Sequence, residues 1–224
     1  MTALEQAPGA GQMQTRSFEW TVHEGGESRR EAIRREAELI AALQRGSRAA
    51  FEVVARAYQS RVYSHCLRMT GDEDQSYDLA QEVFLRVFRN IGRYEHKFAF
   101  YTWIYRITAN CCIDYLRKRK REPTDMRAAH GDAAEGPTME WPLELPDEQF
   151  CPQAAALNGE LRTVISEAIE GLPEKLRMVV VLRDVEGHSY EEIGDILECS
   201  GGTVKSRLFR ARSQLRETLS AYVL

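Results

Sequence analysis

The chain has 224 residues, of which 43% are hydrophobic and 29% are charged, and its formal net charge at pH 7 is −4. This composition is ordinary for a soluble globular protein with one large domain or two small ones. No run of 18 apolar residues is present, and the N-terminus lacks the basic and apolar segments of a secretory signal. We therefore expect a cytoplasmic protein with no direct membrane insertion.

The first part of the chain combines a tail with a predicted helical domain. Residues 1–27 are rich in Gly, Ala, Gln and Glu without periodicity, which predicts a disordered N-terminal tail. Residues 28–121 carry the 3.6-residue hydrophobic period of helices, predicted at 28–46, 47–71, 74–92 and 101–119. Two of these helices supply core candidates on one stripe each: Phe51, Val54, Tyr58, Val62 and Cys66 in the second, and Tyr77, Ala80, Phe84 and Val87 in the third.

Residues 122–157 are predicted to form a flexible acidic linker. Five prolines and two glycines in this span exclude a long helix: Pro123, Pro137, Pro142, Pro146, Pro152, Gly131 and Gly136. Residues 122–160 also hold nine acids and only Arg127 as a fixed positive charge. Such a segment can screen neighbouring basic surfaces and so discourage DNA binding by the free protein.

Helical periodicity returns over residues 158–224, with helices predicted at about 158–170, 174–186, 189–198 and 202–221. The last two helices and the short segment between them indicate a helix-turn-helix, with Cys199 to Gly202 as the turn and Thr203 capping or beginning the next helix. No alternating strand pattern competes. The predicted fold is therefore all-α, with two small helical domains joined by the linker.

The final helix has an apolar stripe and an opposite basic face. Val204, Leu208, Ala211, Leu215 and Leu219 follow helical spacing, and residues 203–216 contain five basic side chains and no acid. Because burying Leu208 forces the next residues outward, the first turns present candidate readers of duplex DNA in the major groove: Lys205, Ser206, Phe209 and Arg210. The alternative is a helical bundle with a solvated basic face.

The helix at 101–119 mixes aromatic and basic residues in a different way. A helical wheel places one stripe on the exposed side: Trp103, Arg106, Asn110 and Arg117. Trp can stack on an unpaired base, Arg can hold phosphate, and Asn can hydrogen-bond a base edge. The buried stripe is predicted to hold Ile104, Ile107, Thr108, Cys111 and Tyr115. For Phe98, Phe100 and Tyr105, a core position and a DNA contact remain equal alternatives.

Neither a metal site nor a catalytic centre is predicted. The five cysteines are odd in number and irregular in spacing, which indicates reduced and partly buried thiols rather than a disulfide framework. The five histidines have no Ser, Cys or metal-ligand partner at a suitable spacing, and no phosphate-binding glycine loop occurs. We expect no cofactor and no enzymatic activity.

Several motifs, in order, resemble the sigma-70 family of RNA polymerase sigma factors. The segment from Phe100 to Asn110 and the following Asp-Tyr-Leu-Arg-Lys-Arg are similar to regions 2.3–2.4, and Asp78-Leu-Ala-Gln-Glu-Val-Phe is similar to region 2.2. Leu172-Pro-Glu-Lys-Leu-Arg, Ser189-Tyr-Glu-Glu-Ile-Gly and Gly202-Thr-Val-Lys-Ser-Arg resemble region 4. The lack of an intervening region 3 domain resembles the extracytoplasmic-function (ECF, group 4) class, and Ala99-Phe-Tyr-Thr-Trp is similar to its sigma E branch.

This resemblance implies a bacterial transcription initiation factor that binds core RNA polymerase through the beta-prime and beta subunits and directs it to promoter DNA. It implies three sets of residues. Core polymerase binding carries over to Asp78, Gln81, Glu82 and Leu85; recognition and melting of the −10 element to Tyr101, Trp103, Arg106, Asn110 and Arg117; and reading of the −35 duplex to Arg183, Lys205, Ser206, Phe209 and Arg210.

The resemblance further implies an anti-sigma factor as a partner, which often holds such proteins at the membrane, and a role in a stress or extracytoplasmic response. Two departures from the family pattern occur. Ser200-Gly201-Gly202 replaces a turn that often reads Pro-Val-Gly or Ser-Val-Gly, and Ser76-Tyr77-Asp78 replaces Ala-Glu-Asp. A stand-alone helix-turn-helix regulator is the alternative function, and a helical interaction protein with merely solvated basic faces is a third.

Overall fold

The computed structural model describes residues 29–121 and 159–222. Within these ranges every regular element is a helix and none is a strand, which confirms the all-α prediction. The predicted N-terminal tail and linker lie outside the described residues. The elements are α1 (Arg29–Gln44), α2 (Arg48–Thr70), α3 (Glu73–Asn90), η1 (Ile91–Arg93), α4 (Phe100–Arg121), α5 (Gly159–Glu170), α6 (Glu174–Val180), η5 (Val181–Val185), α7 (Tyr190–Ile196), α8 (Gly201–Leu219) and η6 (Ser220–Tyr222).

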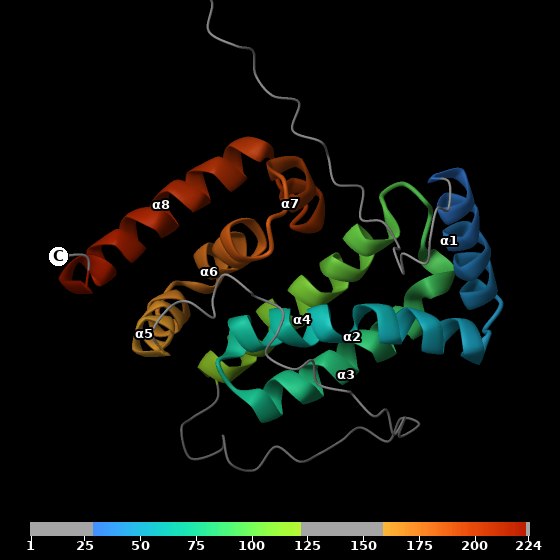
Figure 1. Cartoon of the computed structure of the whole chain (residues 1–224), viewed down its shortest axis with the longest axis horizontal. Coiled ribbons are helices and arrows are strands. Elements are labelled where there is room, and N and C mark those ends of the chain that lie inside the picture. Colours follow the sequence, from blue (N-terminus) through green and yellow to red (C-terminus); the bar gives the residue numbers. More distant parts are fainter. Residues whose placement is uncertain (1–28, 122–158, 223–224) are drawn as a thin grey trace, which may run out of the picture.

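The helices α1 to α4 form the first helical unit, with α2 at its centre (Figure 1). Ser47 caps the N-terminus of α2 by accepting a hydrogen bond from the Ala50 amide, and Gly71 ends the helix with φ of +71°. A positive φ is inexpensive for glycine alone, which explains the stop at this residue. The predicted stripe of α2 is buried throughout: Phe51, Val54, Tyr58, Val62 and Cys66.

The second helical unit contains α5 to α8, and its core is made where α6, α7 and α8 meet. Met178, Leu182, Ile193 and Leu208 are each at most 2% exposed. The chain leaves α6 through a short π-helical turn, η5, before α7 begins. Ser189 and Glu192 form a complete capping box at the start of α7, which satisfies two backbone amides that a helix leaves without partners.

The start of α8 corrects the predicted turn. Ser200 is the N-cap, and its side chain accepts a hydrogen bond from the Thr203 amide at 3.2 Å. Gly201 and Gly202 therefore form the first turn of α8 rather than the connection before it. Serine is a favoured N-cap because its side-chain oxygen accepts a hydrogen bond from an amide that the helix leaves without a partner. This capping hydrogen bond outweighs the tendency of the two glycines to form a turn.

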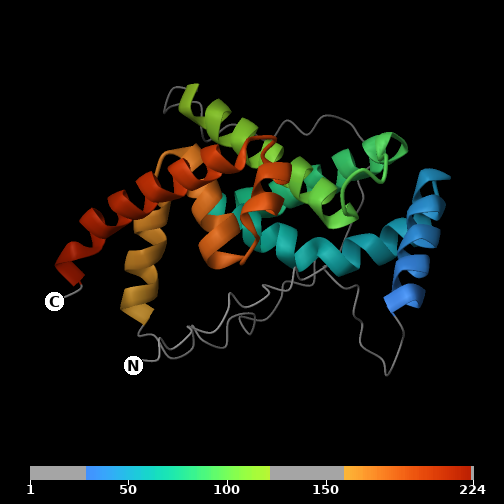
Figure 2. The ribbon, with the colours of Figure 1, turned by 90° about the horizontal axis from the view of Figure 1, so that it is seen from above.

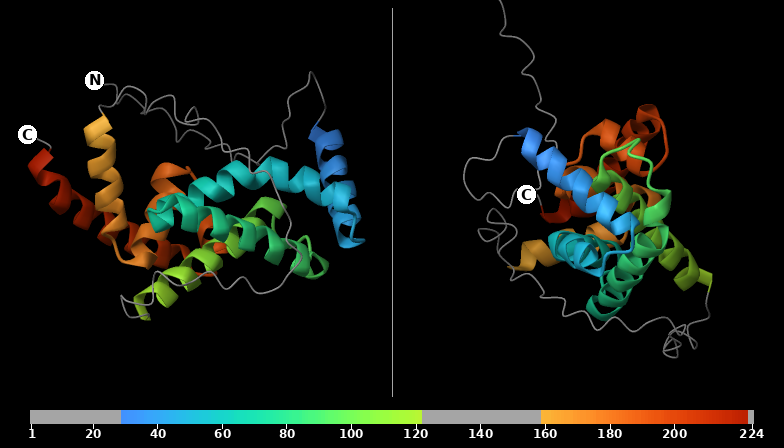
Figure 3. Two further views of the ribbon diagram at one scale, coloured as in Figure 1. Left: turned by 90° about the horizontal axis from the view of Figure 1, so that it is seen from below. Right: turned by 90° about the vertical axis from the view of Figure 1, so that its right-hand side faces the viewer.

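The two helical units pack directly against each other. Helix α4 lies against α6 and α7, and α2 lies against α5 and α6 (Figures 1 and 2). Three orientations place α1 at one end of the molecule and α8 toward the opposite end (Figures 1, 2 and 3). The buried apolar residues of both units form one continuous cluster. As a result, α4 has one face toward α2 and α3 and another toward the second unit.

Candidate nucleic-acid and polymerase interfaces

The residues predicted to bind core polymerase lie along the outer side of α3. Asp78 is exposed, whereas Gln81, Glu82 and Leu85 are half-buried. The opposite side of the helix buries its apolar residues in the first unit: Leu79, Ala80, Val83, Phe84 and Val87. The four predicted side chains therefore share one accessible face of a firmly packed helix.

One residue on this face was not singled out from the sequence. Phe88 follows Leu85 by three positions and is 38% exposed, and its ring meets Phe51 edge-on at 5.1 Å. Helical spacing from Leu85 was the available signal, because residues three apart lie on one face. Glu82 pairs with Arg86 at 2.6 Å, so part of the charge on this face is already balanced within α3.

Aromatic rings gather at the N-terminal end of α4. Trp103 is half-buried and stacks on Phe100 with centroids 5.8 Å apart, while Tyr94 lies 5.4 Å from the Trp103 ring. Phe100 and Tyr105 are at most 5% exposed, so both occupy core positions rather than positions that could contact DNA. Phe98 is half-buried, with the Arg106 guanidinium 4.1 Å above its ring.

The predicted −10 residues on α4 have unequal access to solvent. Asn110 and Arg117 are exposed, as the helical wheel predicted. The prediction is wrong for Trp103 and Arg106, which are half-buried, and Tyr101 is only 7% exposed. For Tyr101 and Arg106 the physical reason is the second helical unit, because α7 packs against the first half of α4, whereas Trp103 is covered by Phe100 and Tyr94 of its own unit.

Tyr101 and Arg106 are held by α7 and the segment that follows it. The Tyr101 hydroxyl donates a hydrogen bond to Glu192, and burial together with this bond raises the pKa of Tyr101. Arg106 Nε donates to the Asp195 carbonyl at 2.5 Å, and Arg106 Nη1 lies 3.2 Å from Glu198 Oε1. Both α4 side chains therefore have partners in the second unit.

The basic C-terminal end of α4 meets one acid of the second unit. Lys120 Nζ lies 2.6 Å from Glu174 Oε2, and Arg117 Nε lies 3.9 Å from Glu174 Oε1. The hydrogen bond from Lys120 lowers the pKa of Glu174, so this carboxylate stays charged at neutral pH. The remaining basic residues of the run are exposed: Lys118, Arg119 and Arg121.

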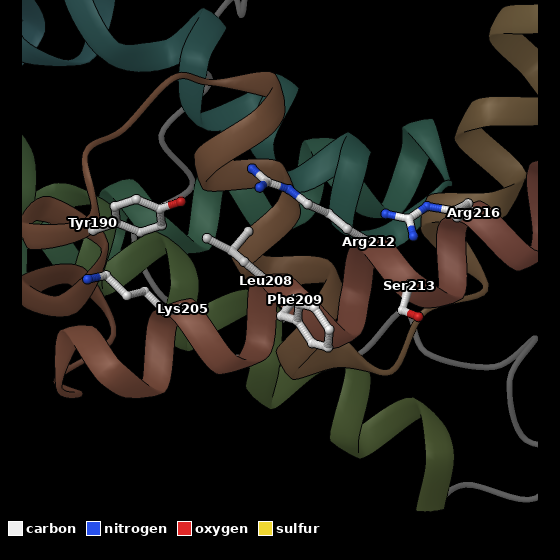
Figure 4. Close-up of a pocket in the computed structure, with 7 residues that line it drawn as sticks. All are labelled: Tyr190, Lys205, Leu208, Phe209, Arg212, Ser213 and Arg216. Atoms are coloured by element: carbon white, nitrogen blue, oxygen red, sulfur yellow. The ribbon is translucent and has the colours of Figure 1, made fainter.

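The predicted duplex-reading residues share the open side of α8, as the wheel predicted. Val204, Leu208 and Ala211 are buried, whereas Lys205, Ser206, Phe209 and Arg210 are exposed. Phe209 is 77% exposed. A groove of about 340 Å³ lies along this helix. Figure 4 shows the residues that line it: Tyr190, Lys205, Leu208, Phe209, Arg212, Ser213 and Arg216.

Arg183, the remaining predicted −35 residue, lies beside α8 on η5. Its Nη1 donates to the His188 carbonyl at 2.7 Å, and its guanidinium lies 4.9 Å from the Tyr190 ring. Lys205 Nζ lies 6.0 Å from the same ring, so Tyr190 connects Arg183 to the face of α8. Nearby, Arg212 is held by Asp184 at 2.5 Å. Sequence spacing gave no signal for either the Tyr190 contact or this ion pair.

Both helical units match models of known protein families. The family model described as Sigma-70 region 2 matches residues 54–122, and the model described as Sigma-70, region 4 matches residues 162–215. Together they cover the described helices from the second turn of α2 to the end of α4, and most of α5 to α8. The fold and the two matches define a sigma factor of RNA polymerase.

Curated relatives agree with this class over most of the chain. The RNA polymerase sigma-H factor of Pseudomonas aeruginosa is 36% identical over 182 residues, covering 81% of this chain and 92% of that protein. The ECF RNA polymerase sigma-E factor of Escherichia coli K12 is 38% identical over 177 residues, covering 79% and 90%. The chain belongs to the sigma-70 family, in its ECF class. It is a transcription initiation factor that binds core RNA polymerase and directs it to promoters.

Solved structures share the fold. The sigma factor RpoE of Bartonella quintana, in complex with the anti-sigma factor NepR, superposes with a TM-score of 0.54 at 23% identity, covering 76% of this chain and 96% of that chain. CnrH, in complex with the cytosolic domain of CnrY, gives a TM-score of 0.57 at 21% identity, covering 82% and 96%. Within residues 29–121 and 159–222, no helix is long and apolar enough to cross a membrane.

Proposed function

We propose that three faces of the chain divide the work of promoter recognition: α3 binds core polymerase, α4 binds the opened −10 element, and α8 reads the −35 duplex. The observation that carries this division is the one-sided surface of α8. Four polar, basic or aromatic side chains are exposed there, directly opposite three buried apolar ones. Phe209 is more exposed than any other large hydrophobic side chain in the described residues, and its place beside Arg210 suits a contact with DNA.

On α8, Lys205 and Ser206 lie in the first two turns, where a recognition helix meets base edges. Arg210 is the candidate for the most specific contact, because a guanidinium can bond both O6 and N7 of a guanine. Phe209 is suited to packing against a thymine methyl group. Arg183 acts from the flank, where the His188 carbonyl and the Tyr190 ring fix its guanidinium.

On α4, Trp103 is proposed to stack on an unpaired base. Its support by Phe100 and Tyr94 keeps the indole oriented, which lowers the entropy that stacking must overcome. Asn110 and Arg117 are exposed on later turns, suited to a base edge and a phosphate. Tyr101 and Arg106 become available for DNA only when their partners in the second unit move away.

On α3, Asp78, Gln81, Glu82 and Leu85 are proposed to contact the beta-prime subunit of core polymerase. The surface is mixed, with carboxylates beside an aliphatic side chain, and it lies on a helix whose other side is fixed in the core. Rigid support of this kind reduces the ordering cost of binding. The beta subunit is the proposed partner of the second helical unit.

We further propose control by an anti-sigma factor, in a stress or extracytoplasmic response in the bacterial cytoplasm. Support comes from two proteins of the same fold, which were solved with NepR, an anti-sigma factor, and with the cytosolic domain of CnrY. A membrane-anchored anti-sigma factor would hold this protein at the membrane without any insertion of its own helices.

In vitro transcription tests the proposed function directly. Purified core polymerase is used with and without the full chain on a fragmented genomic library from the source bacterium. The proposal predicts discrete new transcripts that share −35 and −10 sequences upstream. Arg210→Ala should reduce transcription from promoters that depend on the −35 element about tenfold or more, because one bidentate contact gives about 1–3 kcal/mol of discrimination. Binding to core polymerase should stay intact.

Arg34→Ala is the matched control, since Arg34 is an exposed arginine on α1, at the other end of the molecule. It should transcribe as the wild type does. The alternative, a stand-alone helix-turn-helix regulator, predicts no transcripts but tight specific binding of duplex DNA by the chain alone. If the chain neither directs transcription nor binds duplex DNA, its basic faces are merely solvated. DNA binding that does not weaken with salt would contradict the proposed contacts to phosphate.

A further inference from the structure

Two cations proposed to read the −35 duplex converge on one aromatic ring. The Arg183 guanidinium lies 4.9 Å from the centroid of the Tyr190 ring, and Lys205 Nζ lies 6.0 Å from the same centroid. Arg183 belongs to η5, Tyr190 begins α7, and Lys205 lies in the first turns of α8. Three separate elements therefore meet at this ring, and each contributes one side chain.

The ring lies beside the open side of α8. Tyr190 is half-buried and lines the groove of α8 together with Lys205 and Phe209 (Figure 4). The face of a tyrosine ring is electronegative, and it attracts a cation that lies within about 6 Å of its centre. Tyr190 therefore restrains the direction of two long side chains on the part of the molecule proposed to meet duplex DNA.

The charge of Arg183 is not taken up by the acid that follows it in the chain. The Asp184 carboxylate is held by Arg212 through two hydrogen bonds, at 2.5 and 3.1 Å. Arg183 is fixed instead by neutral groups, the Tyr190 ring and the His188 carbonyl, to which its Nη1 donates at 2.7 Å. An aromatic ring or a carbonyl orients a cation without cancelling its charge, so that charge remains available for phosphate.

Orientation before binding matters most for Lys205. A lysine has a flexible four-carbon stem, and the freedom of this stem is lost when its ammonium group contacts DNA. A contact with the Tyr190 ring already restricts the stem in the free protein, so less freedom is lost on binding. Arg183 depends less on the ring, because the His188 carbonyl fixes its guanidinium at a second point.

We propose that Tyr190 is a positioning residue for −35 recognition, which acts on DNA through Arg183 and Lys205 by holding both cations against its ring. This inference rests on the proposed function, because it needs both cations to contact the −35 duplex. It assigns no direct DNA contact to Tyr190. The aromatic ring carries the role and the hydroxyl does not, so phenylalanine should replace tyrosine at this position.

A double-mutant cycle tests whether Tyr190 acts through the two cations. Tyr190→Leu and Tyr190→Phe are each made in the wild-type chain and in a chain that carries Arg183→Ala with Lys205→Ala. Filter binding at low temperature gives the affinity of each holoenzyme for a promoter that the transcription assay identifies. Tyr222→Leu is the matched control, because it removes an exposed tyrosine from the same helical unit.

We expect Tyr190→Leu to weaken promoter binding about three- to tenfold in the wild-type chain, which corresponds to the loss of two exposed cation–π contacts. Tyr190→Phe and Tyr222→Leu should bind within about twofold of the wild type. In the Arg183/Lys205 background, Tyr190→Leu should cause no further loss, because the groups through which it acts are absent. Equal losses for Tyr190→Leu in both backgrounds would overturn the proposal, since a direct DNA contact or a damaged fold acts without the cations.

Nuclear magnetic resonance of the free full-length chain tests the contact itself. The side-chain protons nearest Lys205 Nζ should show upfield ring-current shifts that persist in Tyr190→Phe and disappear in Tyr190→Leu. If the wild type lacks these shifts, the ring does not hold Lys205 in solution and the proposal is wrong. A purely structural role of Tyr190 in the core of the unit does not predict this difference between the two variants.

Failure of the proposed −35 surface gives a different pattern. A chain that yields no promoter, or whose Arg183/Lys205 variant binds promoter DNA as the wild type does, contradicts the −35 surface, and the role of Tyr190 falls with it. If the Arg183/Lys205 variant binds weakly while Tyr190→Leu loses affinity equally in both backgrounds, the −35 surface stands and positioning by the ring is wrong.

Discussion

Leu208 and Phe209 are neighbours on α8 with opposite surroundings. Leu208 is 2% exposed and packs in the core of the second unit, whereas Phe209 is 77% exposed and lines the groove of α8 (Figure 4). The helical rotation of about 100° per residue separates them, so substituting each to alanine distinguishes packing from binding. This pair allows the role of α8 to be tested at single residues.

We expect Phe209→Ala to leave the free energy of unfolding within about 0.5 kcal/mol of the wild type, because most of the side chain is already exposed. We expect Leu208→Ala to lower it by about 2–5 kcal/mol, through lost burial and a cavity. Urea unfolding measures both. At a temperature where the Phe209→Ala variant is fully folded, holoenzyme that contains it should bind −35 duplex DNA more weakly than wild-type holoenzyme. Unchanged binding would remove Phe209 from the −35 surface.

Trp103 is the residue on which promoter opening is expected to depend most. One stacked base contributes about 1–3 kcal/mol, so Trp103→Ala should slow formation of the open complex about tenfold. Permanganate reactivity of unpaired thymines measures opening, and filter binding at low temperature measures duplex contact. Contact with the −35 duplex should be unchanged, because α8 lies apart from Trp103. Normal opening by this variant would contradict the melting role.

At the scale of elements, local hydrogen bonding fixes where the DNA-facing helices begin. The Ser189 and Glu192 side chains cap α7, and Ser200 caps α8. Ser189 therefore sets the start of α7, and Ser200 sets the end of the connection between α7 and α8. Its geometry determines how α8 is presented to a duplex, since α7 and α8 pack on each other.

Ser189→Ala should lower the free energy of unfolding by about 1 kcal/mol, because the Glu192 amide loses its acceptor. Chemical denaturation monitored by circular dichroism measures this loss. Ser166→Ala is the control, since Ser166 is an exposed residue inside α5. There alanine has the higher helix propensity, so stability should be unchanged or slightly greater. Equal effects at both serines would show that the capping box does not stabilise α7.

At the scale of the whole molecule, the contact between the two units contains a titratable centre. Burial opposes ionisation of Glu186, but its electrostatic interactions with His65 and His188 and its hydrogen bond with His65 outweigh it and lower the pKa of Glu186 to about 2. The groups that face it are His65, Arg68, His188 and Tyr105. The ionised carboxylate thus favours the packed arrangement.

The sign of the pH dependence follows from this lowered pKa. The stabilisation from Glu186 is fully present above its ordinary pKa of 4.5 and is lost as pH falls toward 2. The thermal midpoint of the full chain should therefore drop between pH 4.5 and 2. Glu186→Gln should flatten this part of the profile, and Glu191→Gln, at an exposed position, should not. A profile unchanged by Glu186→Gln would exclude this residue as the titrating group.

The sequence by itself determined the helices and the faces that each helix buries within its own unit. Periodicity over α2 identified its buried stripe, and the spacing of Leu208 and Phe209 gave the open side of α8. These features are local, because a residue's direction on a helix is fixed by its position in the chain. The ordered motifs also identified the family, which the two family-model matches confirm.

Only the tertiary structure decided how the two units meet. The wheel of α4 predicted an open stripe, yet Arg106 contacts the end of α7, whose residues lie about 90 positions further along the chain. Hydrophobic periodicity carries no signal for such a contact, because Glu192, Asp195 and Glu198 read as an ordinary solvated face. Pairing between distant charged side chains depends on how two packed units approach each other, and this is a property of the folded molecule as a whole.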